Sequence, residues 1–349
     1  MHEDFVVKAN IKRNEFLLQT EVFFVANKSK WFDDFAEHFR DLCAQVRKLQ
    51  DELVLSAATY LEYTMLYTNF INRHYVADIF VYGEKGYLDK SQRFIGSYDI
   101  SFLFVYYDML WDDLLALKKR YFGKVAAKEI TDFMIRTLPA FYSYFIGIVR
   151  FGIVKCIDEC PVIDIDKNEE FMVNVGNYMA ETETVYSEKK HKDANELTEW
   201  FNELFLNKYI CGDYSNLDFT GKVFQYTDFR YARFQNSTLN NTNFEGSSLI
   251  GANFRNAMME KCRIDCCSIF EADFSNAKLK GASFVNTRAK AGLTDEKEWK
   301  FAGFLPVNFS YADLTNAIFT GANLAGADFT GAILNGADFT DAVLDNAIF

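Results

Sequence analysis

A five-residue periodicity in the C-terminal part of the chain constrains its fold more than any other feature. From Phe219 every fifth residue is apolar as far as Phe284, and the series resumes at Phe309 and continues to Phe349. From Ala232 to Ala282 and again from Ala312 on, the residue two places before these positions is small, most often alanine. Neither a helix of period 3.6 nor a strand of period 2 fits this spacing. The sequence therefore predicts repeats that turn one large and one small side chain inward.

The residues between these positions predict sharp corners. Glycine or asparagine often stands two places after the large residue, where a corner needs a positive φ. Four asparagines recur every twenty residues and are expected to stack as one ladder, which Asn316 would continue two coils further on: Asn216, Asn236, Asn256 and Asn276. Proline is absent from 213–287 and 308–349, as an unbroken hydrogen-bond ladder requires.

This pattern resembles the pentapeptide-repeat family, whose repeat reads Ala-(Asp/Asn)-(Leu/Phe)-x-x. Four stretches match it as they stand: Ala312-Asp313-Leu314, Ala322-Asn323-Leu324, Ala327-Asp328-Phe329 and Ala337-Asp338-Phe339. The resemblance covers about residues 214–349. It implies a right-handed quadrilateral β-helix with four pentapeptides in each coil.

Residues 288–307 interrupt the repeat. Thr294 followed by Asp295 and Glu296 is typical of a helix N-terminus, so a short helix is expected to run through Trp299. The break spans a multiple of five residues, so the five-residue phase survives it. It is either one decorated coil or a loop between two stacked coils, and either a structural patch or a recognition loop.

Residues 1–210 carry mainly helical patterns and predict an α-helical bundle of five to six helices. Residues 82–97 read as a glycine-containing loop and 157–170 as an acidic connector. A kink is expected at Pro139. The last helix is expected to cap the first coil of the solenoid. The expected helices are 28–54, 56–81, 98–121, 124–155 and 192–208. The predicted fold class is therefore α+β multidomain, with this domain followed by the solenoid at 214–349.

Composition predicts a cytoplasmic protein that spans no membrane. The chain lacks an uncharged apolar stretch of membrane-spanning length, and its first residues do not resemble a signal peptide. The 7 cysteines are scattered, so reduced thiols are expected, with Cys262 and Cys267 at the small inward position and Cys266 outward. The net charge of −12 disfavours direct nucleic-acid binding.

The sequence predicts no catalytic residue, no metal site and no cofactor. The 4 histidines lie far apart and none has metal-site spacing. Asp164, Asp166 and Asn168 begin like a calcium loop but lack its glycine and its terminal glutamate. A further acidic group on one helix is read as a solvated face, although it could hold a cation or a basic partner: Asp108, Asp112 and Asp113.

Outward acids make the end of the repeat region a candidate partner-binding surface. Residues 301–349 contain 5 Asp and neither Lys nor Arg. Elsewhere the signs are mixed, since twenty-residue spacing places Asp218 with Lys278 and Asp228 with Arg288. The candidate partner-binding residues are Asp313, Asp328, Asp338, Asp341, Asp345, Phe349 and Trp299.

These observations predict a non-catalytic protein-interaction or scaffold protein, with a rigid solenoid and a helical domain that supplies specificity. Family members that act on DNA gyrase resemble a DNA duplex in width and charge, so a DNA-mimic modulator of a type II topoisomerase is one alternative. An enzyme or ligand sensor in the helical domain is another, and a polar cleft with convergent ionisable groups would favour it. The last coil ends on Phe349 without a cap, so a homodimer through this coil is expected.

Overall fold

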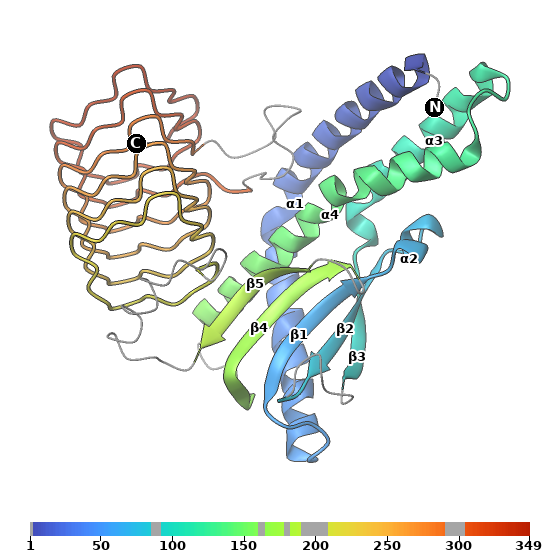
Figure 1. Ribbon diagram of the computed structural model, residues 1–349, viewed down its shortest axis with the longest axis horizontal. Coiled ribbons are helices and arrows are strands. Elements are labelled where there is room, and N and C mark those ends of the chain that lie inside the picture. Colours follow the sequence, from blue (N-terminus) through green and yellow to red (C-terminus); the bar gives the residue numbers. More distant parts are fainter. Residues whose placement is uncertain (1–2, 85–91, 160–164, 178–181, 190–208, 290–303) are drawn as a thin grey trace. The chain divides into compact units, whose positions relative to one another are not determined.

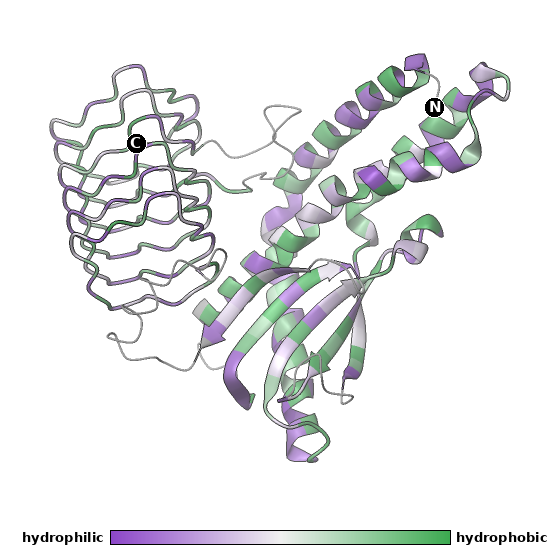
Figure 2. Ribbon diagram, in the orientation of Figure 1, coloured by the Kyte–Doolittle hydropathy of each residue, from purple (hydrophilic) through white to green (hydrophobic). Residues whose placement is uncertain are grey.

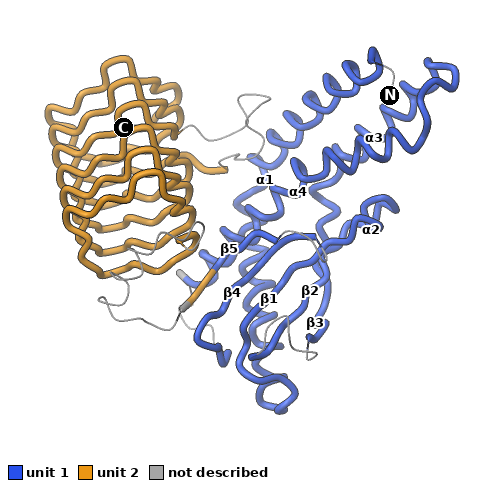
Figure 3. Tube along the Cα trace, in the orientation of Figure 1, with its two compact units in different colours: residues 1–186, 295–300 blue, residues 187–294, 301–349 orange. Residues whose placement is uncertain are grey.

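The structure is a computed structural model that describes residues 3–84, 92–159, 165–177, 182–189, 209–289 and 304–349. The chain forms two compact units, one built from residues 1–186 and one that begins at Ser187 and contains the repeats (Figure 3). The predicted helix at 192–208 and Trp299 lie outside the described residues.

The first unit combines long helices with a five-stranded sheet (Figure 1). Its elements are α1 (Glu3–Asp51), β1 (Ala58–Met65), α2 (Tyr67–Ile71), β2 (Val76–Tyr82), β3 (Arg93–Asp99), η2 (Ser101–Leu103), α3 (Val105–Lys118), η3 (Lys119–Tyr121), α4 (Ala127–Glu159), β4 (Lys167–Asn177) and β5 (Thr182–Lys189). The strand order is β3-β2-β1-β4-β5. β1 pairs antiparallel with β2 and parallel with β4, so the sheet is mixed.

The prediction of an all-helical bundle is wrong because the unit also contains this five-stranded sheet. The predicted helix 56–81 is instead β1, the short α2 and β2, and part of the predicted loop 82–97 is β3. A short apolar run reads equally well as a buried helix or a buried strand, since both of its faces are covered. The alternation of Ala77, Ile79 and Val81 with less buried neighbours was the signal for a strand.

The other helix predictions are confirmed in kind. α1 includes the predicted helix 28–54 almost entirely but begins much earlier, at Glu3. α3 and α4 lie within the predicted helices 98–121 and 124–155, apart from the last residues of α4, and α4 continues through Pro139 as one helix. The prediction of an acidic connector at 157–170 is wrong for its last residues, because β4 already begins at Lys167.

The core of this unit lies between one face of the sheet and the helices α1 and α4. Tyr63 of β1 is fully buried, and its ring lies 5.4 Å from Phe35 of α1 and 6.1 Å from Phe145 of α4. The two helices approach so closely that a Cβ built on Gly152 of α4 would stand 2.6 Å from the Phe35 ring. A glycine is therefore required where the α4 backbone passes that ring.

Among the described residues, one helix passes the length and composition test for a membrane span. This is Ala127–Ile157 of α4, whose best window is 61% buried within the structure. The core helix of a soluble protein passes the same test.

The second unit is a solenoid in which each coil stacks on the next. Parallel bridges join residues twenty apart, such as Asp213 to Arg233 and Asp218 to Thr238, and four bridges recur in each coil. At the large position the backbone N–H donates to the neighbouring coil, as Phe219 does to the carbonyl of Thr238 at 2.7 Å. The predicted repeat is confirmed, and Asp213 brings its start to the predicted boundary.

Side chains of the large positions stack along the axis. The rings of Phe234 and Phe254 are 5.0 Å apart and 4° from parallel, and Phe274 continues the stack at 4.9 Å. All three are fully buried. Figure 2 shows the surrounding alternation of polar and apolar residues along each coil. The rigid core is thus a column of aromatic rings with a spacing set by the coil-to-coil hydrogen bonds.

The corners confirm the expected positive φ. Asn236 and Asn256 have φ of 59°, and Asn256 donates to Asn236 at 3.3 Å, so the asparagine ladder exists. Gly246 has φ of 72°, and a Cβ there would lie 2.5 Å from the Tyr226 ring of the previous coil. Residues other than glycine and asparagine also take this conformation, including Tyr311 with φ of 58°.

The described coils on the two sides of the interruption stack directly on one another, so the interruption does not add a coil of its own between them. Asp273 pairs with Asn308, thirty-five residues away, and Lys278 pairs with Asp313. The insertion therefore adds fifteen residues to a regular coil, which preserves the five-residue phase but shifts the chain by one side. For that reason the expectation that Asn316 continues the asparagine ladder is wrong. The backbone N–H of Asn276 donates to Ser310, and that of Gly281 donates to Thr315. Asn316 therefore lies in the same column as Gly281 and not in the column of Asn276.

Substituting Gly152 with alanine should destabilise the first unit. Alanine would otherwise favour a helix by about 1 kcal/mol, but the added methyl group overlaps the Phe35 ring. We expect a lower denaturation midpoint for Gly152→Ala, measured by urea unfolding followed by circular dichroism. Val154→Ala, at a position of α4 that is 45% exposed, is the control and should change the midpoint little. An unchanged or raised midpoint for Gly152→Ala would contradict the close approach of the two helices.

Candidate interaction surface

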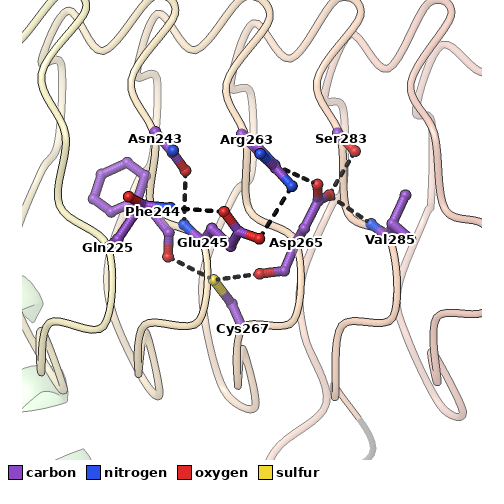
Figure 4. Close-up of polar contacts among 9 residues, drawn as sticks. All are labelled: Gln225, Asn243, Phe244, Glu245, Arg263, Asp265, Cys267, Ser283 and Val285. Atoms are coloured by element: carbon purple, nitrogen blue, oxygen red, sulfur yellow. Dashed lines mark hydrogen bonds and ion pairs between the residues drawn. The ribbon is translucent and has the colours of Figure 1, made fainter.

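One side of the solenoid carries a polar network that crosses four coils (Figure 4). Gln225 donates to Glu245 at 2.7 Å, and Arg263 donates to Glu245 at 3.0 Å. Arg263 also donates to Asp265 at 2.7 Å, and the Ser283 hydroxyl donates to the same carboxylate at 2.5 Å. These charges are paired with one another between coils. The network therefore stabilises the stacking and leaves little unpaired charge for a partner.

Beneath this network the small inward position also carries hydrogen-bond donors. The Cys267 thiol donates to the carbonyl of Phe244 at 3.0 Å, as the Ser247 hydroxyl does to that of Phe224 at 2.6 Å. Burial raises the pKa of Cys262 and Cys267 to about 12, so both thiols stay protonated. Cys266 is exposed, as expected.

The aspartates of the repeat stabilise turns of the backbone. Asp313 accepts a hydrogen bond from the backbone N–H of Thr315 at 3.2 Å, and Asp328 accepts one from Thr330 at 2.8 Å. Asn308 does the same for Ser310 at 2.9 Å. Where Asp or Asn stands before the large residue, its side-chain oxygen thus caps its own turn, whereas Arg263, Lys278 and Ile318 occupy the same position in other repeats. Negative charge is not what this position requires.

The structure distributes the predicted partner-binding acids around the solenoid. Asp328 bridges to Asn308, Asp313 to Lys278 and Asp338 to Ile318, so the three lie on three different ladders. Asp341 occupies a corner with φ of 56°, and Asp345 is exposed. The acids surround the last coils as an acidic collar, defined here as Asp313, Asp328, Asp338, Asp341 and Asp345, and do not converge on one point.

Hydrogen bonds keep parts of this collar ionised. The Thr315 hydroxyl and, to a lesser extent, its N–H hold the pKa of Asp313 below its usual range, and Lys278 and Lys280 act in the same direction. Thr340 lowers the pKa of Asp338 in the same way. Residues 301–349 contain no Lys or Arg, so no basic side chain from this segment neutralises the collar.

The inward face of the last coil is partly open to solvent. Phe349 stacks on Phe329 at 5.2 Å but is 63% exposed. Leu334, Phe339 and Leu344, at the axis positions of the same coil, are only partly buried. This end is therefore an apolar surface bordered by the acidic collar.

The acids noted on α3 bind other parts of the first unit. Asp108 accepts a hydrogen bond from Tyr75 at 2.5 Å, Asp112 pairs with Arg73, and Asp113 pairs with Lys12 of α1 at 2.5 Å. These pairs tie α3 to α1 and to the segment before β2. The reading of a merely solvated face is incomplete, since each acid has a basic or hydroxyl partner.

The histidine and calcium-loop candidates do not form a site among the described residues. His38 is packed against the Tyr98 ring at 4.5 Å, and burial lowers its pKa to about 4, so it is neutral near pH 7. Asp166 pairs with Arg47 at 3.4 Å, and Asn168 donates to Thr59 at 3.2 Å. The described residues contain no group of three or more His, Cys, Asp or Glu that could hold a metal ion.

The sheet of the first unit has a second, polar face that sequence reasoning missed. Glu62 of β1 points away from Tyr63 and the helices, and it lies in register with Phe80 of β2 and Asn174 of β4. Glu62 is 6% exposed and Asn174 4% exposed. Burial raises the pKa of Glu62, and a hydrogen bond with Tyr82 partly opposes this.

Comparisons with known proteins concern the repeat region. A family profile described as pentapeptide repeats matches residues 215–264 and 307–349 with 8 copies. No curated protein matches the chain.

Several solved structures are similar over the repeats. Rfr23, a pentapeptide repeat protein from the cyanobacterium Cyanothece 51142, is 17% identical with a TM-score of 0.23, and the match covers 44% of this chain and 99% of that one. HetL, a pentapeptide repeat protein involved in heterocyst differentiation regulation in Nostoc sp. strain PCC 7120, is 20% identical with a TM-score of 0.18, covering 45% and 95%. QnrB1, a plasmid-mediated fluoroquinolone resistance protein, is 20% identical with a TM-score of 0.19, covering 39% and 85%.

Replacing Asp313 should separate the turn function of the acid from its charge. Asp313→Asn keeps the acceptor for Thr315 and should leave stability at pH 7 nearly unchanged. Asp313→Ala removes it and should cost about 1 kcal/mol. Because the folded pKa of Asp313 is lowered from 3.8, the small advantage of Asp over Asn is present above that pH and is lost as the pH falls through the folded pKa.

Chemical denaturation at several pH values, followed by hydrogen exchange at residues 308–328, measures these differences. Equal losses for Asp313→Asn and Asp313→Ala would show that charge, and not the turn, is what matters at this position.

Proposed function

We propose that this chain, whose C-terminal region belongs to the pentapeptide-repeat family, is a non-catalytic interaction protein that uses the repeat region as a rigid binding surface. The observation that carries the proposal is the acidic collar, which surrounds partly exposed apolar side chains of the last coils. A charged rim around an apolar centre is the anatomy of protein interfaces. The partner is expected to be a protein with a basic rim and an apolar contact, and nucleic acid is not expected to bind directly.

The proposal includes the geometry of a right-handed quadrilateral β-helix. Four bridges per coil and twenty residues between paired positions support four flat sides. Flat sides of fixed spacing suit a scaffold, because the stacked aromatic axis holds every outward position at a constant distance from the next. We also propose a cytoplasmic location, consistent with the free thiols among the described cysteines.

A DNA-mimic modulator of a type II topoisomerase is the less favoured alternative. Such a mimic needs continuous negative charge along its sides. Here Asp218 shares a ladder with Lys278, and Asp228 shares one with Arg288, as the sequence spacing predicts. Arg263 also neutralises Glu245 and Asp265 on the side shown in Figure 4. Purified protein is expected neither to inhibit gyrase supercoiling nor to protect gyrase from a quinolone, and either effect would reverse this ranking.

A ligand sensor in the first unit is a second candidate, because the polar sheet face contains the buried Glu62 carboxyl beside Asn174. A buried carboxyl with a raised pKa is typical of functional sites, although structural networks also produce it. Thermal-shift screening of small amines and polar metabolites against the full chain and Glu62→Gln tests this idea. A ligand whose stabilisation depends on Glu62 would support it.

Removing charge from the collar should weaken partner binding. Asp341→Asn with Asp345→Asn deletes two exposed charges, and asparagine tolerates the positive φ at position 341. Immobilised full-length protein is used to capture proteins from a lysate, with identification by mass spectrometry. The expected partner is retained by the wild type, and binding is reduced by the double variant and by added salt.

The matched control for this experiment removes two charges elsewhere. Asp218→Asn with Glu260→Gln changes the net charge by the same amount. Asp218 lies at the other end of the repeat region, and Glu260 lies between the two ends. Loss of the same partner in both variants would attribute binding to overall charge and would count against the collar.

We further propose that a second copy of the chain covers the open end of the last coil. Phe349→Glu should reduce the mass measured by light scattering at matched concentration, because a charge in an apolar interface is costly. Val223→Glu, at a position that is 65% exposed in an earlier coil, is the control and should leave the mass unchanged. Equal masses for the wild type and Phe349→Glu would rule out this dimer.

A further inference from the structure

The N-terminal half of α1 carries an exposed apolar stripe. It consists of five residues that are 58%, 53%, 52%, 71% and 51% exposed, respectively: Val7, Ile11, Leu18, Val22 and Val25. Successive members are three, four or seven residues apart, which places them on one face of the helix. The stripe extends for about 27 Å at 1.5 Å per residue. An aligned row of this length differs from the single exposed apolar residues that are normal on surfaces.

The neighbouring helices occupy other sides of α1. α3 contacts it through Lys12, which pairs with Asp113, and α4 contacts it through Phe24, whose ring lies 4.9 Å from Tyr144. The buried residues of this half of α1 include Ala9 and Phe16, about half a turn away from the stripe. In Figure 1 this part of α1 runs beside α3 and α4 beyond the sheet. The first unit therefore completes its core without using the stripe.

We propose that this stripe is a homodimer interface in which α1 packs antiparallel against α1 of a second copy. The stripe reads almost the same in both directions about position 16. In an antiparallel pair centred there, Val7 of one copy lies opposite Val25 of the other, Ile11 lies near Val22, and Leu18 lies opposite Asn14. An isologous dimer needs a self-complementary surface of this kind.

The side-chain types also fit a helix pair. Ile11, Leu18 and Val25 recur every seven residues, which is the spacing of one core position of a coiled coil, and two of them are β-branched. Asn14 lies in the stripe between apolar residues, and its side-chain oxygen accepts hydrogen bonds from Arg13 of the same helix at 2.9 and 3.1 Å. A lipid surface or an unrelated partner would not require a sequence that is symmetric about its centre.

Charges at the two ends of the stripe favour the antiparallel direction. Glu3 and Asp4 lie at its start, where Asp4 pairs with Lys8 at 2.8 Å and Glu3 carries the remaining charge, whereas Lys28 and Lys30 lie just beyond Val25. In the antiparallel pair the acidic end of each copy faces the basic end of the other, with Glu3 and Lys28 on the same flank. A parallel pair would place like charges together at both ends, which is unfavourable.

This inference is independent of the proposed role of the repeats, and the experiment separates the two. All variants of the full chain carry Phe349→Glu, so the open end of the last coil does not contribute to association. Light scattering coupled to size exclusion should give twice the chain mass for this background and the single-chain mass when Leu18→Glu or Val22→Glu is added. Val154→Glu, at a position of α4 that is 45% exposed, is the matched control and should remain dimeric.

Crosslinking tests the direction of the helices. In a background with Cys160→Ser and Cys266→Ser, a mixture of Val7→Cys and Val25→Cys chains should form a covalent dimer under mild oxidation. Each variant alone should not, because like positions lie at opposite ends of an antiparallel pair. Crosslinking of Val7→Cys alone would show a parallel pair and overturn the antiparallel register.

Two other outcomes would overturn the interface itself. One is a monomeric Phe349→Glu background at concentrations up to about 100 μM, where even a weak dimer of about 10 μM affinity would be mostly formed. The other is binding of that monomer to anionic lipid vesicles that is lost in Leu18→Glu, which would assign the stripe to a membrane surface. Unchanged circular dichroism in every variant confirms that the exposed substitutions leave the fold intact.

Discussion

Hydrogen bonding of each coil to the next is the interaction on which the repeat region depends. In the regular coils the N–H of the large residue donates to a carbonyl nineteen residues ahead, as Phe254 does to Asp273 at 2.7 Å. This bond sets the separation of the coils, and it thereby sets the separation of the rings stacked on the axis. One large and one small inward residue recur in most repeats, which fills a column of fixed width at close packing. The interruption is tolerated because Asn308 resumes this bonding with Phe274 at once.

The same constraint determines which outward charges are available to a partner. Acids that precede the large residue are held to their own turns, as Asp313 is to Thr315. Acids and bases in the middle coils pair between coils, as Arg263 does with Glu245. The last coils differ, since their segment contains no Lys or Arg. The composition alone distinguishes the middle coils, whose charges are paired, from the last coils, which are acidic. The position of each acid around the solenoid follows instead from the register of the coils.

The first unit depends on a different contact, the packing of α1 and α4 against one sheet face around Phe35, Tyr63 and Phe145. Helix periodicity in α3, α4 and the second half of α1 was readable from the sequence because each has a continuous apolar face, whereas residues 3–27 of α1 were not predicted. The strand β1 was not readable as a strand, because Tyr63 is covered on the helix side while Glu62 and Thr64 are also buried on the other face. A segment buried on both faces loses the alternation that identifies a strand. The polar sheet face, and with it the buried Glu62, was therefore invisible before the sheet was known.

The sequence by itself determined the repeat, its period, the inward positions and the residue types at the corners, because a five-residue pattern repeated over many coils is local and redundant. It also determined that Asp218 and Lys278 share a side. Only the tertiary structure decided that Asp273 stacks directly on Asn308, since the number of inserted residues does not say whether they form a coil or a loop. Only the tertiary structure likewise decided that Leu18 is exposed while Leu17 is buried, because two adjacent leucines of one helix differ only in what packs beside them.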